Sequence, residues 1–283
     1  STPIAADAKE ISFGKNINNT THQYHLIETA EQIEKLLEKL LASDKICFDT
    51  ETTSLDANNC ALVGISFSII PHEAYYVPIP SNPSEAQQLI QRFKPVFENK
   101  NSIKIGQNIK YDQLVLKWYD IEIHGTLFDT MLAHYLMDAD SRHNMDALSE
   151  NYLGYTPISI TELIGKKGSN QKNMRDVPLM QIKEYAAEDA DVTLQLHHVF
   201  NKEIENTHLH KLFYEVETPL IPVLTDMEYE GVKIDTEFLK NYSDEIADEI
   251  IILKEDILKT CSAQFNIDSP KQLGDILFEK MGI

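Results

Sequence analysis

Apolar and polar residues follow two alternating patterns along the first 110 residues, and these patterns predict the elements of a folded domain. Residues 23–27 are typical of a short strand. Thr29 and Gln32 have the spacing of a capping box at a helix start. The helix that follows is predicted to continue to about Ser43, because apolar residues recur behind the cap at helical spacing: Ile33, Leu36, Leu37, Leu40 and Leu41.

The next segments have the composition of strands separated by short polar breaks, which favours antiparallel neighbours. We expect strands at residues 45–51, 61–69 and 74–79. A helix over residues 84–97 and a strand over 103–106 are predicted next, and helices and short strands alternate from there. This order predicts an α/β domain with a mixed sheet flanked by helices.

The pattern changes after about residue 208, where strand-like segments give way to helices. A helical stretch ends at Gly231, a long helix is predicted over residues 236–261, and a last helix runs over 270–281. We therefore expect a linker over 1–20, one domain over 21–210 and a short all-α segment over 211–283. The last helix runs almost to Ile283, so we expect the sequence to be a piece of a longer protein.

Composition adds an acidic charge to this picture. The chain has 283 residues, with 25 Lys and Arg against 45 Asp and Glu, which gives a formal net charge of −20. A nucleic-acid binder usually shows a basic surface, and this chain shows none in its composition. The acidic excess is spread over both parts, which favours a role in solubility, with a smaller part in a carboxylate cluster that needs metal ions.

Location and redox state also follow from composition. No apolar run reaches the length of a membrane span, and the N-terminus lacks the pattern of an export signal. The three cysteines, Cys47, Cys60 and Cys261, lack the spacing of a metal site. We expect reduced, buried thiols in a cytoplasmic protein.

Asp49 and Glu51 end a predicted strand and are the first candidates for chemistry. Residues i and i+2 of a strand point to the same face. Two adjacent carboxylates repel each other unless they share a cation or a proton. The alternative is an exposed strand end with solvated acids.

Asn108 and Asp112 are four residues apart, a spacing that a helix places on one face. Asp112 is therefore a candidate partner for the first two acids. The alternative is that Asn108 caps the helix and that Asp112 lies on the surface.

Tyr185 and Asp189 share the same spacing, and Asp189 is the stronger functional candidate because it lies beside an aromatic hydroxyl. Its neighbours Glu188 and Asp191 are expected to lie on a solvated face. The small residues of the same segment, Ala186, Ala187 and Ala190, indicate close packing of this helix on its neighbours.

Together these segments supply four carboxylates and one tyrosine. Hard oxygen ligands suit Mg²⁺ or Mn²⁺ rather than zinc. A pair of such ions about 3.5–4 Å apart can activate water, orient a phosphodiester and stabilise the leaving oxygen. A tyrosine close to the ions could orient the water.

Three segments carry a resemblance to a known family: FDTET at 48–52, GQNIKYD at 106–112 and YAAEDAD at 185–191. They resemble the three exonuclease motifs of the bacterial DNA polymerase I family (family A), in the proofreading part of its Klenow-type fragment. Further similar segments extend the resemblance from about residue 23 to the end of the chain: 124–132, 142–148, 217–224 and 231–235.

The resemblance implies a ribonuclease H-like fold and a site with two divalent cations, Mg²⁺ with Mn²⁺ or Zn²⁺ as alternatives. Asp49 would bridge both ions, and Glu51 and Asp189 would hold the ion that carries the attacking water. Asp112 would hold the second ion largely through water, and Tyr185 would orient the attacking water. Leu55 would wedge against the terminal bases, within a set of implied DNA contacts: Thr50, Leu55, Gln107, Asn108, Tyr111 and Arg142.

The implied activity is 3′–5′ proofreading, in which nucleoside monophosphates are released from single-stranded or frayed DNA 3′ ends. Residues 211–283 would form the base of a polymerase thumb, and 1–20 would connect to a 5′-nuclease region. The expected partners are the DNA end and the rest of the polymerase, for a monomeric bacterial protein at the nucleoid. Two alternatives remain: a non-catalytic DNA-positioning module, and an RNA-trimming exonuclease related to ribonuclease D.

Other conspicuous residues are expected to be structural. Asp129 is predicted to cap a helix, and His197 and His198 are expected to be packed or solvated rather than a metal pair. Trp118 is expected in the core or as an anchor at a helix end. The lysines of the loop 165–172 are expected to be solvated, with contact to the DNA backbone as the alternative.

Overall fold

The computed structural model describes residues 14–168 and 170–283. Most of the predicted linker, residues 1–13, lies outside the described residues. The chain divides into two compact units, and the first ends at Glu230 and the second begins at Gly231. Each unit is described by itself below.

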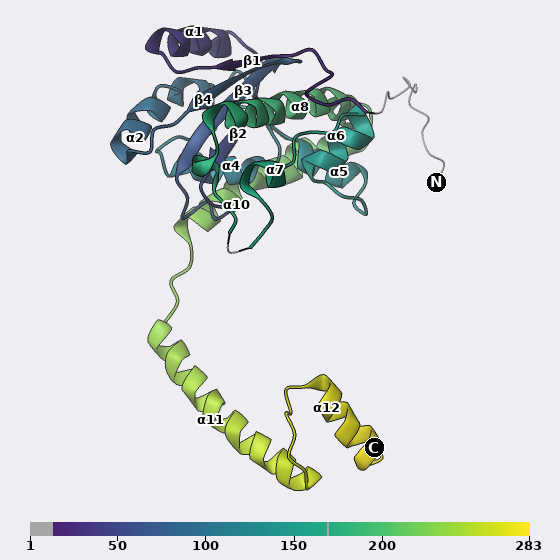
Figure 1. The fold of residues 1–283 in the computed structure, drawn as a ribbon. Coiled ribbons are helices and arrows are strands. Elements are labelled where there is room, and N and C mark those ends of the chain that lie inside the picture. The colour runs from purple at the N-terminus through teal and green to yellow at the C-terminus, as the bar shows by residue number, and fades with distance from the viewer. Residues whose placement is uncertain (1–13, 169) are drawn as a thin grey trace. The chain divides into compact units, whose positions relative to one another are not determined.

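A mixed sheet forms the centre of the first unit, as the sequence predicted, and it has six strands (Figure 1). Its strands lie in the order β1-β4-β3-β2-β5-β6. β3 is antiparallel to both of its neighbours, whereas the β1–β4, β2–β5 and β5–β6 pairs are parallel. The strands are β1 (Gln23–Leu26), β2 (Lys45–Thr52), β3 (Leu62–Ile70), β4 (Glu73–Pro78), β5 (Ile103–Gly106) and β6 (Leu127–Asp129).

Helices cover both faces of this sheet, and the alternation of β2 shows how they are divided. Ile46 and Phe48 pack in a core with α1, α2, α3 and α4. Cys47 faces the other way, into a core with α5, α6 and α8. The helices are α1 (Ala30–Leu41), α2 (Pro83–Gln91), α3 (Lys94–Phe97), α4 (Ile109–Lys117), α5 (Thr130–Met137), α6 (Met145–Leu153), α7 (Ile160–Ile164), α8 (Leu179–Glu205) and α9 (Leu209–Leu212).

Two predicted helices show how local sequence sets element bounds. Thr29 and Gln32 form the predicted capping box of α1, but the helix ends at Leu41, two residues before the expected end, and Leu41 is exposed. The single helix predicted over 84–97 is instead two helices, α2 and α3, separated at Arg92 and Phe93.

The first unit extends beyond the boundary expected near residue 210. After a π-helical turn at Phe213–Glu217, α10 (Thr218–Glu230) packs against α4. The Thr225 hydroxyl donates to Gln113 Oε1 at 3.0 Å, and both residues are buried. Packing with α4 therefore places α10 in the same compact unit as the sheet.

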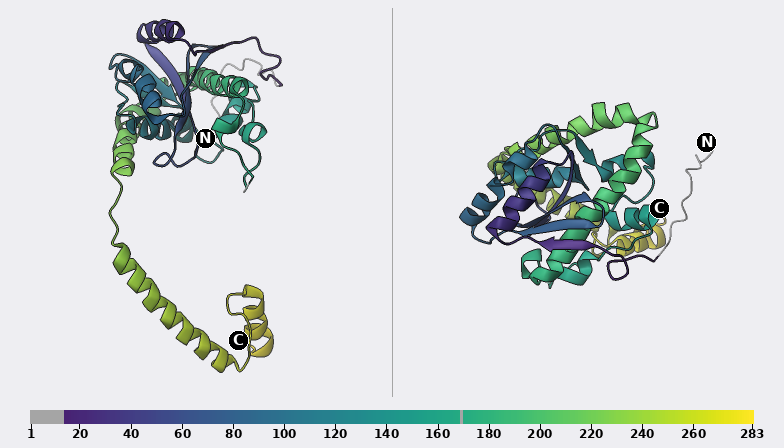
Figure 2. Two further views of the ribbon diagram at one scale, coloured as in Figure 1. Left: turned by 60° about the vertical axis from the view of Figure 1, so that its left-hand side comes forward. Right: turned by 90° about the horizontal axis from the view of Figure 1, so that it is seen from above.

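The second unit is helical, as expected, and contains α11 (Thr236–Cys261), α12 (Pro270–Gly274) and a π-helical turn at Asp275–Lys280 (Figure 2). Cys47, Cys60 and Cys261 are all free thiols, and Cys60 is only half-buried. None of the described helices has the length and apolar content that a membrane span requires.

Candidate active site

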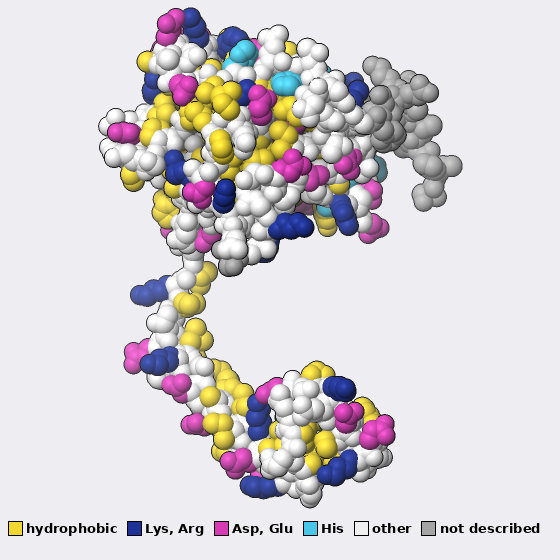
Figure 3. All heavy atoms as spheres, in the orientation of Figure 1, with side chains coloured by type: hydrophobic (Ala, Val, Ile, Leu, Met, Phe, Trp, Pro, Cys, Tyr) yellow, Lys and Arg dark blue, Asp and Glu magenta, His cyan; other side chains and the backbone are white. Residues whose placement is uncertain are grey.

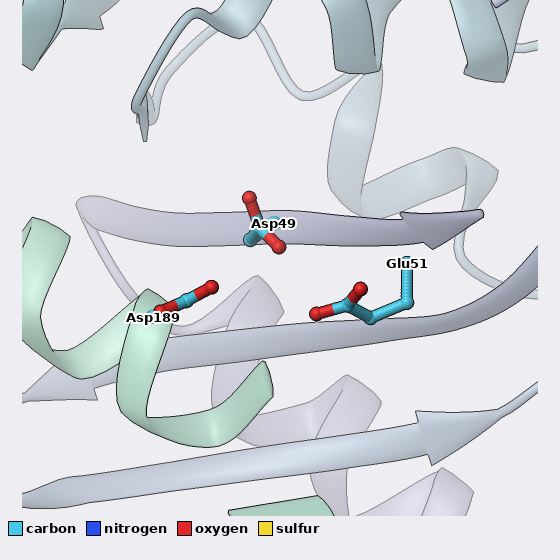
Figure 4. Close-up of side chains that lie close together, drawn as sticks. All are labelled: Asp49, Glu51 and Asp189. Atoms are coloured by element: carbon cyan, nitrogen blue, oxygen red, sulfur yellow. The ribbon is translucent and has the colours of Figure 1, made fainter. Parts of the chain in front are cut away.

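The end of β2 places two carboxylates under helix α8. Asp49 and Glu51 share the face of β2 that Cys47 presents to α8, which confirms the prediction from strand alternation. Asp189 approaches them from α8 (Figure 4). Asp49, Glu51 and Asp189 each offer one oxygen, and the three oxygens lie within 4.8 Å of one another.

These acids are withdrawn from solvent. Glu51 is 6% exposed and Asp189 is 5% exposed, whereas Asp49 is part-buried. Glu51 Oε1 is buried and has no hydrogen-bond partner among the described residues. The alternative of an exposed strand end with solvated acids is therefore wrong. A buried carboxylate oxygen without a donor needs a compensating cation or proton.

Electrostatics leads to the same requirement. Burial raises the pKa of Asp49 well above its usual value, and the charges of Asp112 and Asp189 raise it further. Burial also raises the pKa of Glu51, with further contributions from Asp49 and Asp112. The pKa of Asp189 is raised by burial and by Glu51. The cluster destabilises its own ionised form unless a cation compensates the charge.

Asp112 adjoins this cluster from helix α4 and is 2% exposed. Its Oδ1 accepts hydrogen bonds from the Thr50 hydroxyl and from the Thr50 N–H, the latter at 3.0 Å. Burial raises the pKa of Asp112 to about 7, although the two bonds from Thr50 oppose the rise. Three of the four expected carboxylates therefore lie at ligand distance, and Thr50 holds the fourth beside them.

The alternative that Asn108 caps the helix and Asp112 lies on the surface is wrong. The expectation that a shared helix face brings the two residues together is wrong as well. Asn108 precedes α4 in a left-handed conformation with φ 60°, and its side chain makes no capping bond. The two residues therefore do not share a helix face. The cap comes from Asp129, whose carboxylate accepts from the Asn108 and Ile109 N–H groups at 3.2 and 2.9 Å.

Tyr185 lies one helical turn before Asp189 on α8, as the spacing predicted. Burial raises the pKa of its phenol far above the usual value, and Asp189, Glu51 and Asp49 add to the rise. The hydroxyl therefore keeps its proton at neutral pH and can donate a hydrogen bond beside the carboxylates.

A cavity of about 680 Å³ opens over these groups. Leu55 is 93% exposed at its edge, and Tyr111 borders it with its hydroxyl donated to the Ser54 carbonyl at 2.6 Å. Five of the six expected DNA contacts line this cavity: Thr50, Leu55, Gln107, Asn108 and Tyr111. Arg142 does not line it and lies exposed in the loop before α6. The residue after Arg142, His143, contacts the cavity lining: its carbonyl accepts a hydrogen bond from Gln107 Nε2 at 2.8 Å.

Comparison with known proteins identifies the family. A family model described as 3′–5′ exonuclease matches residues 24–205. The chain belongs to this exonuclease family. It is 36% identical to DNA polymerase I of Borreliella burgdorferi over 270 residues, which are 94% of this chain and 29% of that protein. The chain thus spans about three-tenths of the length of this relative.

Solved structures support the fold of the exonuclease. The POL domain of Pol1 from M. smegmatis, in complex with DNA primer-template and dNTP, matches with a TM-score of 0.71 at 19% identity. That match covers 91% of this chain and 41% of the other. Brucella melitensis NrnC with bound Mg²⁺ matches with a TM-score of 0.57 at 19% identity, over 77% of this chain and 98% of NrnC.

The exonuclease family implies divalent metal, and the side chains present fit a cation. Asp49, Glu51 and Asp189 supply only oxygen donors, and Glu51 Oε1 lacks any other partner among the residues described. Hard divalent ions prefer such donors.

The expectation that Glu188 and Asp191 are solvated is wrong. They are 0% and 2% exposed. The Glu188 carboxylate accepts from the Tyr155 hydroxyl and from the Ile158 N–H. Asp191 accepts from the Tyr24 hydroxyl at 2.8 Å and from the His72 N–H at 2.7 Å. The sequence signal was the set of alanines around these acids, Ala186, Ala187 and Ala190, which are all fully buried and let α8 pack closely on the sheet.

The residues expected to be structural in the exonuclease do have structural contacts. Asp129 caps α5 as predicted. His197 is buried edge-on against Phe128, whereas His198 is exposed. Trp118 follows the end of α4 and packs its ring against Tyr229.

Sequence reasoning missed one wall of the exonuclease cavity, which comes from α7 and the loop after it. Its residues are Ile160, Ile164, Gln171, Lys172, Asn173 and Met174. The segment has no clear period, and its only sequence signal was the set of lysines in the loop 165–172.

Proposed function

We propose that this exonuclease hydrolyses the 3′-terminal phosphodiester of single-stranded or mispaired DNA and releases nucleoside monophosphates. The observation that carries the proposal is the group of three carboxylate oxygens within 4.8 Å of one another on the cavity floor. A phosphodiester is an anion, so it can approach such a floor only when cations neutralise it.

Each carboxylate has a proposed part in holding two divalent ions. Asp49 would help to hold both ions, Glu51 and Asp189 would hold one, and Asp112 would help to hold the other, largely through water. Such a pair of ions, when bound, supplies an activated water and stabilises the leaving oxygen. We propose Mg²⁺ as the ion, which NrnC, a protein of the same fold, also binds.

The other cavity residues bind and orient the substrate. Tyr185 keeps its phenolic proton, because burial and the neighbouring acids raise its pKa, and its hydroxyl orients the attacking water. Leu55 projects from the cavity edge and contacts the terminal bases. Mispaired ends are preferred because unpairing them costs less free energy than unpairing matched ends.

The parent protein is proposed to be a DNA polymerase I with proofreading activity. The identity to the Borreliella protein extends over 94% of the chain and so includes most of residues 211–283, which we assign to the base of a polymerase thumb. The polymerase active site would lie outside this sequence.

The experiment is digestion of a single-stranded DNA oligonucleotide carrying a 3′-terminal label. We expect release of labelled mononucleotide with Mg²⁺ or Mn²⁺, none with EDTA, and none from Asp49→Ala. Asp44→Ala is the matched control, since Asp44 lies exposed just before β2, at the end away from the cavity. Equal activity of Asp49→Ala and the unaltered protein would refute the mechanism.

Two comparisons distinguish the alternatives. A folded, metal-loaded protein without turnover would favour a DNA-positioning module. Faster digestion of RNA than of a DNA oligonucleotide of matched sequence would favour an RNA-trimming enzyme. NrnC has been solved bound to pGG, so short oligonucleotides belong in the substrate set.

A further inference from the structure

The active-site cavity has two unlike walls. β2, α4 and α8 supply the acidic floor, whereas α7 and the loop after it supply an apolar and amide-rich wall. Lys172 lies in this second wall and is the only Lys or Arg among the described residues that line the cavity. One cation and four carboxylates thus share the lining of this cavity among the described residues.

The backbone at Lys172 is held in place from both sides. Its N–H donates to the Ile164 carbonyl at 3.0 Å. The next residue, Asn173, caps a short 3₁₀ turn at Met174–Asp176. Within that turn, the Arg175 guanidinium donates to the Leu62 and Ile79 carbonyls at 2.6 and 3.1 Å, which ties the segment to the sheet.

The ammonium group of Lys172, in contrast, is not engaged. Its side chain is exposed and forms no ion pair with any residue that the structure describes. Two lysines of α4 differ in this respect, because Lys110 pairs with Glu228 and Lys117 pairs with Asp226. Lys172 therefore combines a fixed backbone with an available charge.

We infer that Lys172 binds a backbone phosphate of the substrate strand close to its 3′ end. The inference rests on the proposed function and adds a positioning residue to it. A lysine ammonium is a compact charge suited to phosphate. On the face shown in Figure 3, basic and acidic side chains are interspersed without a continuous basic surface, so one well-placed cation has a large share in attracting the strand.

A phosphate contact fixes the register of the strand without reading its sequence. Loss of the Lys172 charge is therefore expected to weaken binding equally for all sequences. The residue belongs to the wall formed by α7 and the loop after it and is not assigned to the reacting atoms, so kcat is expected to stay unchanged.

The experiment compares Lys172→Gln with Lys100→Gln. Both lysines are exposed, but Lys100 precedes β5 at the end of the strand away from the cavity. Binding of a fluorescent single-stranded oligonucleotide is measured with Mg²⁺ in an Asp49→Ala background, which prevents cleavage. The slope of log K against log[salt] is expected to become shallower by about 0.7 in Lys172→Gln, since each phosphate contact on a single strand contributes about −0.7 to that slope.

Turnover supplies the second readout. KM is expected to rise several-fold in Lys172→Gln at constant kcat, to be restored in Lys172→Arg, and to be unchanged in Lys100→Gln. Equal salt slopes and KM values for the two Gln variants would overturn the inference, as would a fall in kcat alone.

The binding measurement separates this inference from the proposed function. A reduced salt slope in a protein that never releases mononucleotide would refute the exonuclease proposal and retain the phosphate contact. Metal-dependent release of mononucleotide with an unchanged salt slope in Lys172→Gln would support the exonuclease proposal and refute the phosphate contact.

Discussion

Two groups of acids meet at helix α8 and differ in what surrounds them: Asp49, Glu51 and Asp189, and Glu188 and Asp191. Glu51 has a buried oxygen without a donor, and the pKa of Glu51 is raised by burial and by its acidic neighbours. Glu188 is buried more completely, yet it accepts two hydrogen bonds. Burial alone therefore does not mark a functional acid. A buried oxygen without a donor does so when other carboxylates surround it, as Asp49 and Asp189 surround Glu51, because a cation or a proton must then compensate the charge.

Of the substitutions that test this difference between the two groups of acids, Glu51→Gln is expected to have the largest effect on turnover. Loss of one metal-holding oxygen is expected to reduce turnover by about 10²–10³-fold, the size of losing one group that stabilises developing charge. The same change is expected to raise the melting temperature in EDTA, because it removes a repelling charge. Activity and thermal unfolding measured on one preparation test both, and a destabilised but active variant would contradict the comparison.

Thr50→Val is expected to have the next largest effect. It removes the hydroxyl that donates to Asp112 but keeps the size and the backbone bond of the residue. Loss of a group that orients a metal-holding side chain costs about 10–100-fold in metal affinity. Titration of activity with Mg²⁺ measures the shift, and Thr50→Ser serves as the control that retains the hydroxyl.

Glu188→Ala is expected to affect stability and not chemistry. The change leaves the Tyr155 hydroxyl and the Ile158 N–H without their acceptor. The free energy of unfolding is expected to fall by about 1–3 kcal/mol, the cost of buried donors left unsatisfied. Urea unfolding gives the value, and kcat per folded molecule should equal that of the unaltered protein. A selective loss of kcat would assign Glu188 to the active site.

Stability in EDTA is also expected to depend on pH. Burial holds the pKa of Asp112 at about 7 in the folded chain, above its unfolded value of about 3.9. The unfolded chain therefore ionises first as pH rises, and stability falls between about pH 4 and 7. The melting temperature should be higher at pH 5 than at pH 8, and Mg²⁺ should reduce the difference. An unchanged profile in Asp112→Asn would show that other groups cause it.

Local pattern predicted the parts of the site that depend on local geometry. Strand alternation placed Asp49 and Glu51 on one face, and helical spacing placed Tyr185 beside Asp189. Asn108 escaped that reasoning because a single left-handed residue moved it out of α4.

The partners of the second group of acids could not be predicted from local pattern. Asp191 bonds Tyr24 and His72, which lie 167 and 119 residues away in the sequence. Glu188 bonds Tyr155, 33 residues away. Such pairings depend on the finished sheet, so the same acids look solvated in sequence and are buried in the fold. Lys172 is similar, since its wall is positioned by Arg175 and the ends of two strands.

Asp129 has a consequence for where the chain can be cut. Its carboxylate accepts from Asn108 and Ile109 at the start of α4 and from Met131 and Leu132 at the start of α5. One side chain thus holds two helix N-termini, and α4 carries Asp112. A new pair of termini in the exposed turn at 139–141 would leave this junction intact, whereas a break beside the three-residue strand β6 would release both helices together. Circular permutants of this exonuclease should therefore open after α5 and not before it.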